Sequence, residues 1–198
     1  TSTSVSAEAE MGREIKIGVV APQTGYLAAF SATNDWAVER FHEFVEDGLV
    51  AGDNKKHPVS TVVYDTQSDS NRAAQVTGDL IQNDGVDMVL SAGSPETVNP
   101  SADMCEASEV PSLSSNVPWQ GFTFARGGAL DSSFKWTYAI ALGLEQMVGG
   151  YVDMWGQLAT TKVVGGLWPN NADGQTWSDP ETGAPPMIEA GGYTIELP

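Results

Sequence analysis

Cysteine, histidine and positive charge are scarce in this chain of 198 residues. The single cysteine, Cys105, excludes an internal disulfide framework and a thiolate metal cluster, and two histidines make a histidine-based zinc site improbable. The chain has nine Lys and Arg and 26 Asp and Glu, so its net charge is -17. A chain this acidic repels the phosphates of nucleic acid, which argues against a nucleic-acid-binding protein. No apolar run reaches the ~18 residues that a membrane-spanning helix needs.

The short motifs of common enzyme classes are also missing. The sequence contains no Gly-x-Ser-x-Gly elbow, no Gly-x-x-x-x-Gly-Lys-Ser/Thr phosphate loop and no Gly-x-Gly-x-x-Gly after the first expected strand. His42 falls on an expected helix and His57 in a lysine-rich turn, so neither is placed for base catalysis. The loop acids Asp65, Asp69 and Asp173 do not complete a calcium-binding loop. We therefore expect no catalytic residue, no cofactor and no metal.

Hydrophobic residues make up 41% of the chain, which is enough for a core. Short β-branched runs predict strands at 15–20, 59–64, 86–90 and 110–114. Apolar residues at three- and four-residue spacing predict helices at about 34–48, 70–83 and 99–108, the last with Asn99 as cap and Pro100 in its first turn. This alternation predicts right-handed crossovers and a doubly wound parallel sheet of the α/β class.

A glycine- and aromatic-rich segment, 118–133, interrupts the alternation and is expected to be loop. Beyond it we expect a strand at 134–139, a helix at about 142–158, a strand at 162–168, a short helix at 186–190 and a strand at 193–197. A second sheet of so few strands has bare edges and an incomplete core. This favours either a fragment of a longer chain or a partner that covers the sheet.

Ligands of open parallel sheets bind beyond the carboxyl ends of the strands. The loops expected there are rich in hydroxyls, amides and aromatic rings, and they cover residues 21–31, 65–70, 92–99, 114–120 and 168–174. Such groups hold a small anionic or zwitterionic head and enclose an apolar body. Some of these residues also have a possible structural role in place of ligand binding. Ser94 would cap a turn, and Trp119 and Trp168 would be core or interface aromatics. Cys105 is expected to be a small buried hydrophobe.

Several segments of the chain follow one another in a characteristic order and spacing. They are IKIGVVAPQTG at 15–25, DTQSD at 65–69 and NDGVDMVL at 83–90 leading to Ser94, followed by NVPWQ at 116–120, FKWTY at 134–138 and LWPNNADG at 167–174. Together they resemble the type I periplasmic binding proteins, and more narrowly the branched-chain amino acid (Leu/Ile/Val) group of ABC-transporter solute receptors.

The resemblance implies two lobes that close over a ligand like a hinge. The implied boundaries are ligand-binding lobe one at 14–133 and the first crossover with the start of an incomplete lobe two at 134–198. Residues 1–13, which begin with a small and polar stretch rich in Ser, Thr, Ala and Glu, are expected from their composition to be a disordered tether. The ligand-binding residues are then Phe30 over the ligand, Ser94 for a carboxylate, Ser115, Asn116, Val117 and Trp119 in one loop, Tyr138 at the crossover and Asp173 in lobe two. Pro118 and Trp119 replace the usual hydroxyl residue of that loop, and the acid Asp173 replaces a common aromatic ring and would suit a cationic or hydroxylated ligand.

The function expected from this resemblance is solute binding without chemistry. The chain would be the periplasmic or extracellular component of an ABC importer, with a permease as partner and a lipid anchor as one way of attaching its N-terminus. Its ligand would be a small polar metabolite such as an amino acid or a related compound. Two alternatives stay open: a bilobal ligand sensor without transport, and a flavodoxin-like, nucleotide-dependent enzyme.

Overall fold

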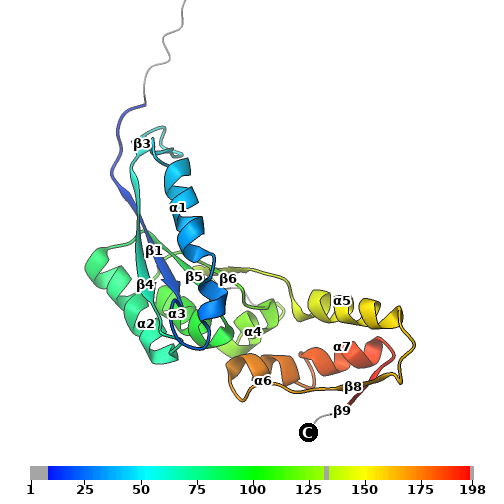
Figure 1. Ribbon diagram of the computed structural model, residues 1–198. Helices are drawn as coiled ribbons and strands as arrows, with labels where there is room; N and C mark the ends of the chain where they lie inside the picture. Colours follow the sequence, from blue (N-terminus) through cyan, green and yellow to red (C-terminus); the bar gives the residue numbers. More distant parts are fainter. Residues whose placement is uncertain (1–8, 132–133, 197–198) are drawn as a thin grey trace, which may run out of the picture.

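A parallel sheet of five strands forms the centre of the computed structural model, which describes residues 9–131 and 134–196. The strands are β1 (Ile15–Ala21), β4 (Val59–Asp65), β5 (Met88–Ala92), β6 (Ser112–Ser115) and β7 (Thr137–Ile140), and they lie in the order β4-β1-β5-β6-β7. Because β1 lies between β4 and β5, the chain winds first to one side of β1 and then to the other (Figure 1). The doubly wound α/β sheet predicted from the sequence is confirmed.

Two helices cover one face of this sheet. They are α2 (Ser70–Asp79), which continues into the π-helical turn η2 (Leu80–Asp84), and α3 (Pro95–Ala107). Val20 of β1 and Val89 of β5 point to this face and pack with Leu80 and Cys105 in the main core cluster. Cys105 is fully buried, and burial raises the pKa of its thiol to about 11, so its expected role as a small buried hydrophobe is confirmed.

The other face is covered on one side only, by α1 (Asn34–Phe44) over β1 and β4 (Figure 1). Successive residues of a strand point to opposite faces, so Val19 and Leu90 point to the α1 face. They share one register row with Leu113 and Tyr138. Toward β6 and β7 this row is open to solvent, with Leu113 37% and Tyr138 58% exposed.

The N-terminal segment is attached to the fold earlier than the expected tether at 1–13 implies. Residues 1–8 lie outside the described part of the chain. The backbone of Gly12 donates to Lys56, Lys56 donates to Glu10, and the Arg13 guanidinium pairs with Asp87 at 2.6 Å. Lys56 belongs to a small antiparallel hairpin of β2 (Leu49–Val50) and β3 (Lys56–His57).

The start of α3 corrects one sequence expectation. The helix begins at Pro95 with Ser94 as its N-cap, whereas the sequence predicted a start at Asn99 and Pro100. Pro100 lies inside the helix, and Asn99 instead donates from its amide to the carbonyl of Gly121 at 2.9 Å. Two Ser/Asn-Pro pairs fit the same capping pattern, and the sequence alone did not tell which pair is used.

The segment expected to be loop at 118–133 contains two helical turns, so that expectation is wrong. They are α4 (Trp119–Thr123) and the 3-10 turn η3 (Phe124–Arg126). Phe122 of α4 is buried with Val98, Ala102 and Val117 in a second core cluster. A helix of one to two turns has little stability of its own, so tertiary packing decides its formation and a periodicity argument misses it.

The chain after β7 forms a smaller α/β unit, which we call the C-terminal unit (residues 144–196). Residues 9–131 and 134–140 form the sheet unit, and residues 141–143 are the crossover between the two. The elements of the C-terminal unit are α5 (Leu144–Gly156), β8 (Val163–Gly165), α6 (Ala172–Ser178), α7 (Ala184–Ala190) and β9 (Thr194–Glu196). β8 and β9 pair in parallel, and Val148, Ile188 and Tyr193 form its core. The unit lies to one side of the large sheet (Figure 1). Within the described residues, no helix combines the length and the apolar character needed to cross a bilayer.

The strong negative charge predicts stability that depends on salt. At a net charge of -17, the negatively charged side chains of the folded chain repel one another and destabilise it. Raising the salt from about 0.1 M to 1 M shortens the screening length from about 10 Å to 3 Å and so weakens this repulsion. We expect the melting temperature in scanning calorimetry to rise by about 4 °C between these concentrations of NaCl, which is about 1 kcal/mol at this size. The double variant Glu46→Gln/Asp47→Asn, at two exposed positions, should show a smaller rise; a flat or falling melting temperature would contradict this explanation.

Candidate ligand-binding site

A cavity of 500 Å³ lies at the carboxyl ends of β6 and β7, where the sheet unit meets α5. Its lining comes from the turn η1 (Ala28–Ser31) and the residue before α1, the loop after β6, the end of β7, the crossover between β7 and α5, and α5 itself. The lining residues are Ala29, Phe30, Thr33, Asn116, Ile140, Ala141, Leu142 and Met147. Ligands of open parallel sheets bind at this edge, and pockets at the junction of two units are common ligand sites.

The cavity combines apolar walls with a few neutral polar groups. Phe30, Leu142 and Met147 supply ring, branched and flexible apolar surface, while Thr33 and Asn116 supply a hydroxyl and an amide. The backbone of Asn116 has φ 63°, a left-handed conformation that asparagine tolerates. Its amide lies 3.5 Å from the carbonyl of Phe30, which leaves most of its hydrogen-bonding capacity free. None of the lining residues is ionisable.

A network of polar contacts holds the loop that carries Phe30. Asp65 accepts from the backbone of Thr24 at 3.1 Å, from its hydroxyl at 2.6 Å and from the backbone of Gln67 at 2.8 Å. Partial burial would raise the pKa of Asp65, but these hydrogen bonds outweigh it and hold the pKa below its ordinary value. Ser68 accepts from the backbone of Leu27 and donates to the carbonyl of Thr24. The 65–69 loop therefore positions the cavity wall without lining it.

Two of the eight predicted site residues, Phe30 and Asn116, meet in this cavity, and the other six do not line it. Ser94 is buried and its hydroxyl accepts from the backbone of Glu96 at 3.3 Å, so it has the plainer role of a helix cap. The side chain of Val117 is buried in the second core cluster, where it reaches neither solvent nor the cavity. The loop that contains Val117 is expected to complete the pocket through its backbone and hydroxyls, and the burial of the Val117 side chain leaves only its backbone for that role.

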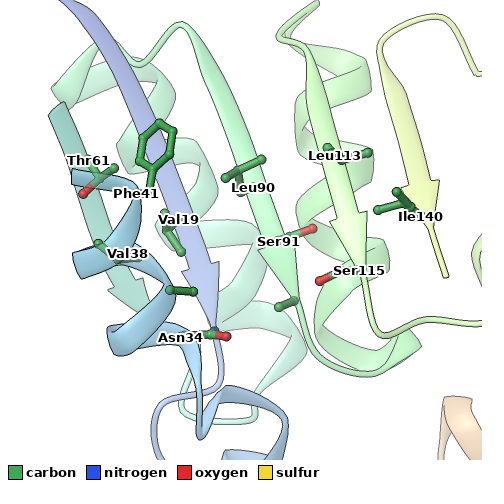
Figure 2. Close-up of a pocket in the computed structure, with 12 residues that line it drawn as sticks. Val19, Asn34, Val38, Phe41, Thr61, Leu90, Ser91, Leu113, Ser115 and Ile140 are labelled. Atoms are coloured by element: carbon green, nitrogen blue, oxygen red, sulfur yellow. The ribbon is translucent and has the colours of Figure 1, made fainter. Parts of the chain in front are cut away.

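Ser115 and Tyr138 lie on the partly covered face of the sheet. Ser115 lines a second cavity, of 330 Å³, between α1 and the strands, together with Phe41, Leu113 and Ile140 (Figure 2). Tyr138 is 58% exposed, and its hydroxyl donates to the carbonyl of Lys135 at 3.2 Å. Both side chains lie outside the lining of the first cavity.

Asp173 lies in the first turn of α6, where the C-terminal unit approaches the sheet unit. Burial and the negative charge of Glu96 raise the pKa of its carboxyl. The hydroxyl of Tyr26 donates to Glu96 at 2.5 Å and is in hydrogen-bond contact with Asn171, and burial and Glu96 raise its pKa to about 12. The packing of α6 against α3 and α4 joins the two units here, but Asp173 does not line the cavity.

Trp119 also contacts the C-terminal unit instead of the cavity. Its indole N–H donates to both carboxylate oxygens of Glu145, at 2.9 and 3.1 Å. The ring packs edge-on against Phe124 at 5.4 Å between centroids.

Sequence reasoning missed the part of the cavity wall that follows β7. Ala141, Leu142 and Met147 line it beside Ile140 at the end of β7, but residues after β7 were not among the expected ligand loops. The strand expected at 134–139 could have predicted this part of the wall, because the segment after a fifth parallel strand lies at the same edge of the sheet as the other four loops. The ends of β7 also shifted, from an expected 134–139 to Thr137–Ile140.

A comparison with models of protein families matches residues 14–179 to the family described as periplasmic binding protein. A comparison with curated proteins finds no match. The solved structures of similar fold include a solute binding protein of an ABC transporter from Rhodopseudomonas palustris BisB5 in complex with 3,4-dihydroxy benzoic acid. It is 19% identical, with a TM-score of 0.70, over 93% of this chain and 46% of that chain.

Two structures that concern amino acids have the same fold. The leucine binding protein LivK from Thermotoga maritima MSB8 is 18% identical, with a TM-score of 0.71, over 93% of this chain and 48% of that chain. The branched-chain amino acid transporter substrate binding protein LivJ from Streptococcus pneumoniae, in complex with isoleucine, is 19% identical, with a TM-score of 0.66, over 93% and 48%. The chain thus spans about half the length of these structures, and the likeness shows the fold they share.

Proposed function

Because the chain belongs to the periplasmic binding protein family, we propose that it binds a small solute in the cavity between its two units, as the extracytoplasmic receptor of an ABC importer. In this proposal residues 14–133 form lobe one, and residues 134–198 form the first crossover and the start of lobe two. The proposed partner is the importer's permease. The proposed lipid anchor concerns the N-terminus, where residues 1–8 lie outside the described part of the chain.

The observation that carries the proposal is the position of the cavity. It lies at the carboxyl ends of the sheet strands and takes wall residues from both units, Phe30 and Asn116 from one and Met147 from the other. A solute that contacts both units favours the arrangement in which they are close, and closure then follows as a shift of population. Binding without transformation fits a wall whose side chains include no acid, base or nucleophile beyond one threonine hydroxyl.

The lining also supports a class of solute. An apolar body would pack against Phe30, Leu142 and Met147, and a polar head would bond to Asn116 and Thr33. Isoleucine and 3,4-dihydroxy benzoic acid, the molecules present in two structures of similar fold, both combine a compact apolar body with a polar head. We therefore propose an amino acid or an aromatic acid as ligand. The proposed contacts leave out the predicted residues that do not line the cavity, which are Ser94, Ser115, Val117, Trp119, Tyr138 and Asp173.

A thermal-shift titration with isoleucine, leucine, 3,4-dihydroxybenzoate and 4-hydroxybenzoate tests the proposal. A solute at 100 times its dissociation constant stabilises the folded chain by about 2.7 kcal/mol, which raises the melting temperature measurably. We expect at least one of the four to do so and to be recovered unchanged by chromatography. Failure of all four would contradict the proposed ligand class, and recovery of a modified solute would contradict binding without chemistry.

Phe30→Ala is expected to weaken binding of the solute identified in this way. Removing the ring deletes the aromatic part of the cavity wall, and we expect the dissociation constant in calorimetric titration to rise about tenfold or more. Tyr138→Phe is the matched control: it keeps a ring outside this cavity and removes only a hydroxyl bonded to Lys135, so the affinity should not change. Equal losses in the two variants would contradict the assignment of the cavity.

A further inference from the structure

Helix α4 is attached firmly to the sheet unit. Its Phe122 is 4% exposed within the second core cluster, and the carbonyl of Gly121 accepts from Asn99 of α3 at 2.9 Å. Gln120, near the start of α4, is only 3% exposed. This short helix therefore moves with the sheet unit, and any contact it makes with α5 is a contact between the two units.

Four hydrogen bonds join α4 to the first turn of α5. The carboxylate of Glu145 accepts from the indole N–H of Trp119 at 2.9 and 3.1 Å and from the side-chain amide of Gln120 at 2.5 Å. In return, the amide oxygen of Gln120 accepts from the backbone N–H of Leu144 at 3.0 Å. Partial burial would raise the pKa of Glu145, but the bonds from Trp119 and Gln120 outweigh it and hold the pKa below its ordinary value.

The glycine before α5 makes room for this network. A Cβ placed on Gly143 would overlap both the Glu145 carboxylate and the indole nitrogen of Trp119. The backbone of Gly143 has φ -79°, which any residue adopts, so the glycine is needed for space and not for backbone freedom. The crossover thus carries a glycine at the position where a side chain would separate Glu145 from Trp119.

We propose that Glu145, bonded to Trp119 and Gln120, is a positioning residue that holds α5 against α4 and so sets the angle between the two units. The two units are also joined by the crossover at 141–143 and by the packing of α6 against α3 and α4. When the Glu145 bonds break, α5 swings about the crossover away from α4.

This arrangement bears on the cavity. Ala141 and Leu142 of the crossover and Met147 of α5 form one wall, and the bonded Leu144 and Glu145 lie between them in the chain. The consequence for solute affinity rests on the proposed function: release of α5 would widen the cavity and weaken binding without removing any residue that touches the solute. The proposal about the angle itself does not depend on solute binding.

Exchanging donor and acceptor supplies a direct test. Gln120→Glu places a second carboxylate against Glu145, and the like charges should separate α5 from α4. Adding Glu145→Gln to this variant restores three of the four bonds and loses only the second, longer bond from Trp119. The carboxylate introduced at position 120 then accepts from the new amide and from the backbone of Leu144, while the new amide oxygen accepts from Trp119. Gln82→Glu, at an exposed position of η2, is the control for one added negative charge.

Gly143→Ala disrupts the same contact by size alone. Two measurements on the solute-free protein follow the angle. Hydrogen exchange at the Leu144 amide should accelerate about tenfold in Gln120→Glu and in Gly143→Ala, while exchange in β1 and β5 stays unchanged. Small-angle scattering should show a larger radius of gyration in both variants. The double variant Gln120→Glu/Glu145→Gln and the control Gln82→Glu should match the original protein in both measurements.

The proposal is overturned if both disrupting variants keep the original Leu144 exchange and radius of gyration, or if Glu145→Gln fails to reverse Gln120→Glu. Should Gln120→Glu fail to fold by circular dichroism, Gly143→Ala and the double variant decide the question. Because no solute is added, a negative result in the thermal-shift titration leaves this test intact, and a negative result here leaves solute binding untouched.

Discussion

Gly174→Ala is expected to destabilise the C-terminal unit by about 3 kcal/mol or more, because the new methyl group has no space. A Cβ on Gly174 would overlap the carbonyl oxygen of Pro169 and lie 2.8 Å from its carbonyl carbon. These are backbone atoms of a loop that folds over the first turn of α6, where Asn171 caps the helix through the backbone N–H of Gly174 at 3.0 Å. The loop must move away to admit the methyl group, and the cap is then lost.

Urea unfolding followed by tryptophan fluorescence measures this effect, since Trp168 and Trp177 pack in the core of the same unit. The control is Gly150→Ala, in the middle of α5, where the position is exposed and a Cβ would meet no atom within 4 Å. This second substitution should stabilise the protein by about 0.5–1 kcal/mol through helix propensity. Equal effects of the two alanines would show that the close approach at Pro169 is absent in solution.

Arg126→Ala is expected to cost about 3 kcal/mol, because the guanidinium is part of the core. Its side chain is 1% exposed and stacks on the ring of Phe134 at 3.8 Å and that of Phe122 at 4.5 Å from the centroids. It also pairs with Asp103 of α3 at 2.6 Å and donates to Thr137 of β7 at 3.1 Å. One side chain thus joins α3, η3 and the edge strand, and alanine removes all of these contacts.

Two further variants separate packing from charge. Arg126→Met refills most of the volume without the charge, so its loss in urea unfolding should be smaller than that of alanine. Arg40→Ala, on exposed α1, removes a side chain that forms ion pairs with Glu39 and Glu43 at the surface and should cost less than about 0.5 kcal/mol. If Arg126→Ala were as mild as Arg40→Ala, the stacking on Phe122 and Phe134 would not contribute to stability.

The elements that the sequence predicted well share one physical property, a long local pattern. The β-branched run at 15–20 became β1 at Ile15–Ala21, and the apolar periodicity at 142–158 became α5 at Leu144–Gly156. The two α-helices that it missed, α4 and α6, are five and seven residues long. Such short helices have less than two turns, too few for a recognisable apolar periodicity. They form because Phe122 and Trp177 pack against core residues from other parts of the chain.

The site was predictable as an edge of the sheet but not as a set of side chains. The loops after parallel strands meet at one edge whatever their residues, so the region of the site followed from the strand order alone. Whether Ser94 caps a helix or faces a cavity depends on where α3 begins, which is settled by packing against the sheet. In the structure Ser94 is the cap, and Val117 is in the core.

The alternation of strand and helix patterns was sufficient to obtain the α/β class, the parallel sheet and the expectation of a ligand at its carboxyl edge, because these patterns are local and repeat over many residues. Folding in three dimensions decided that Phe30 and Asn116, which lie 86 positions apart, share a cavity and that Trp119 contacts Glu145 instead. Contacts between distant loops depend on the angle at which whole units pack. That angle is determined by many packing contacts between distant residues, so no short stretch of sequence predicts it.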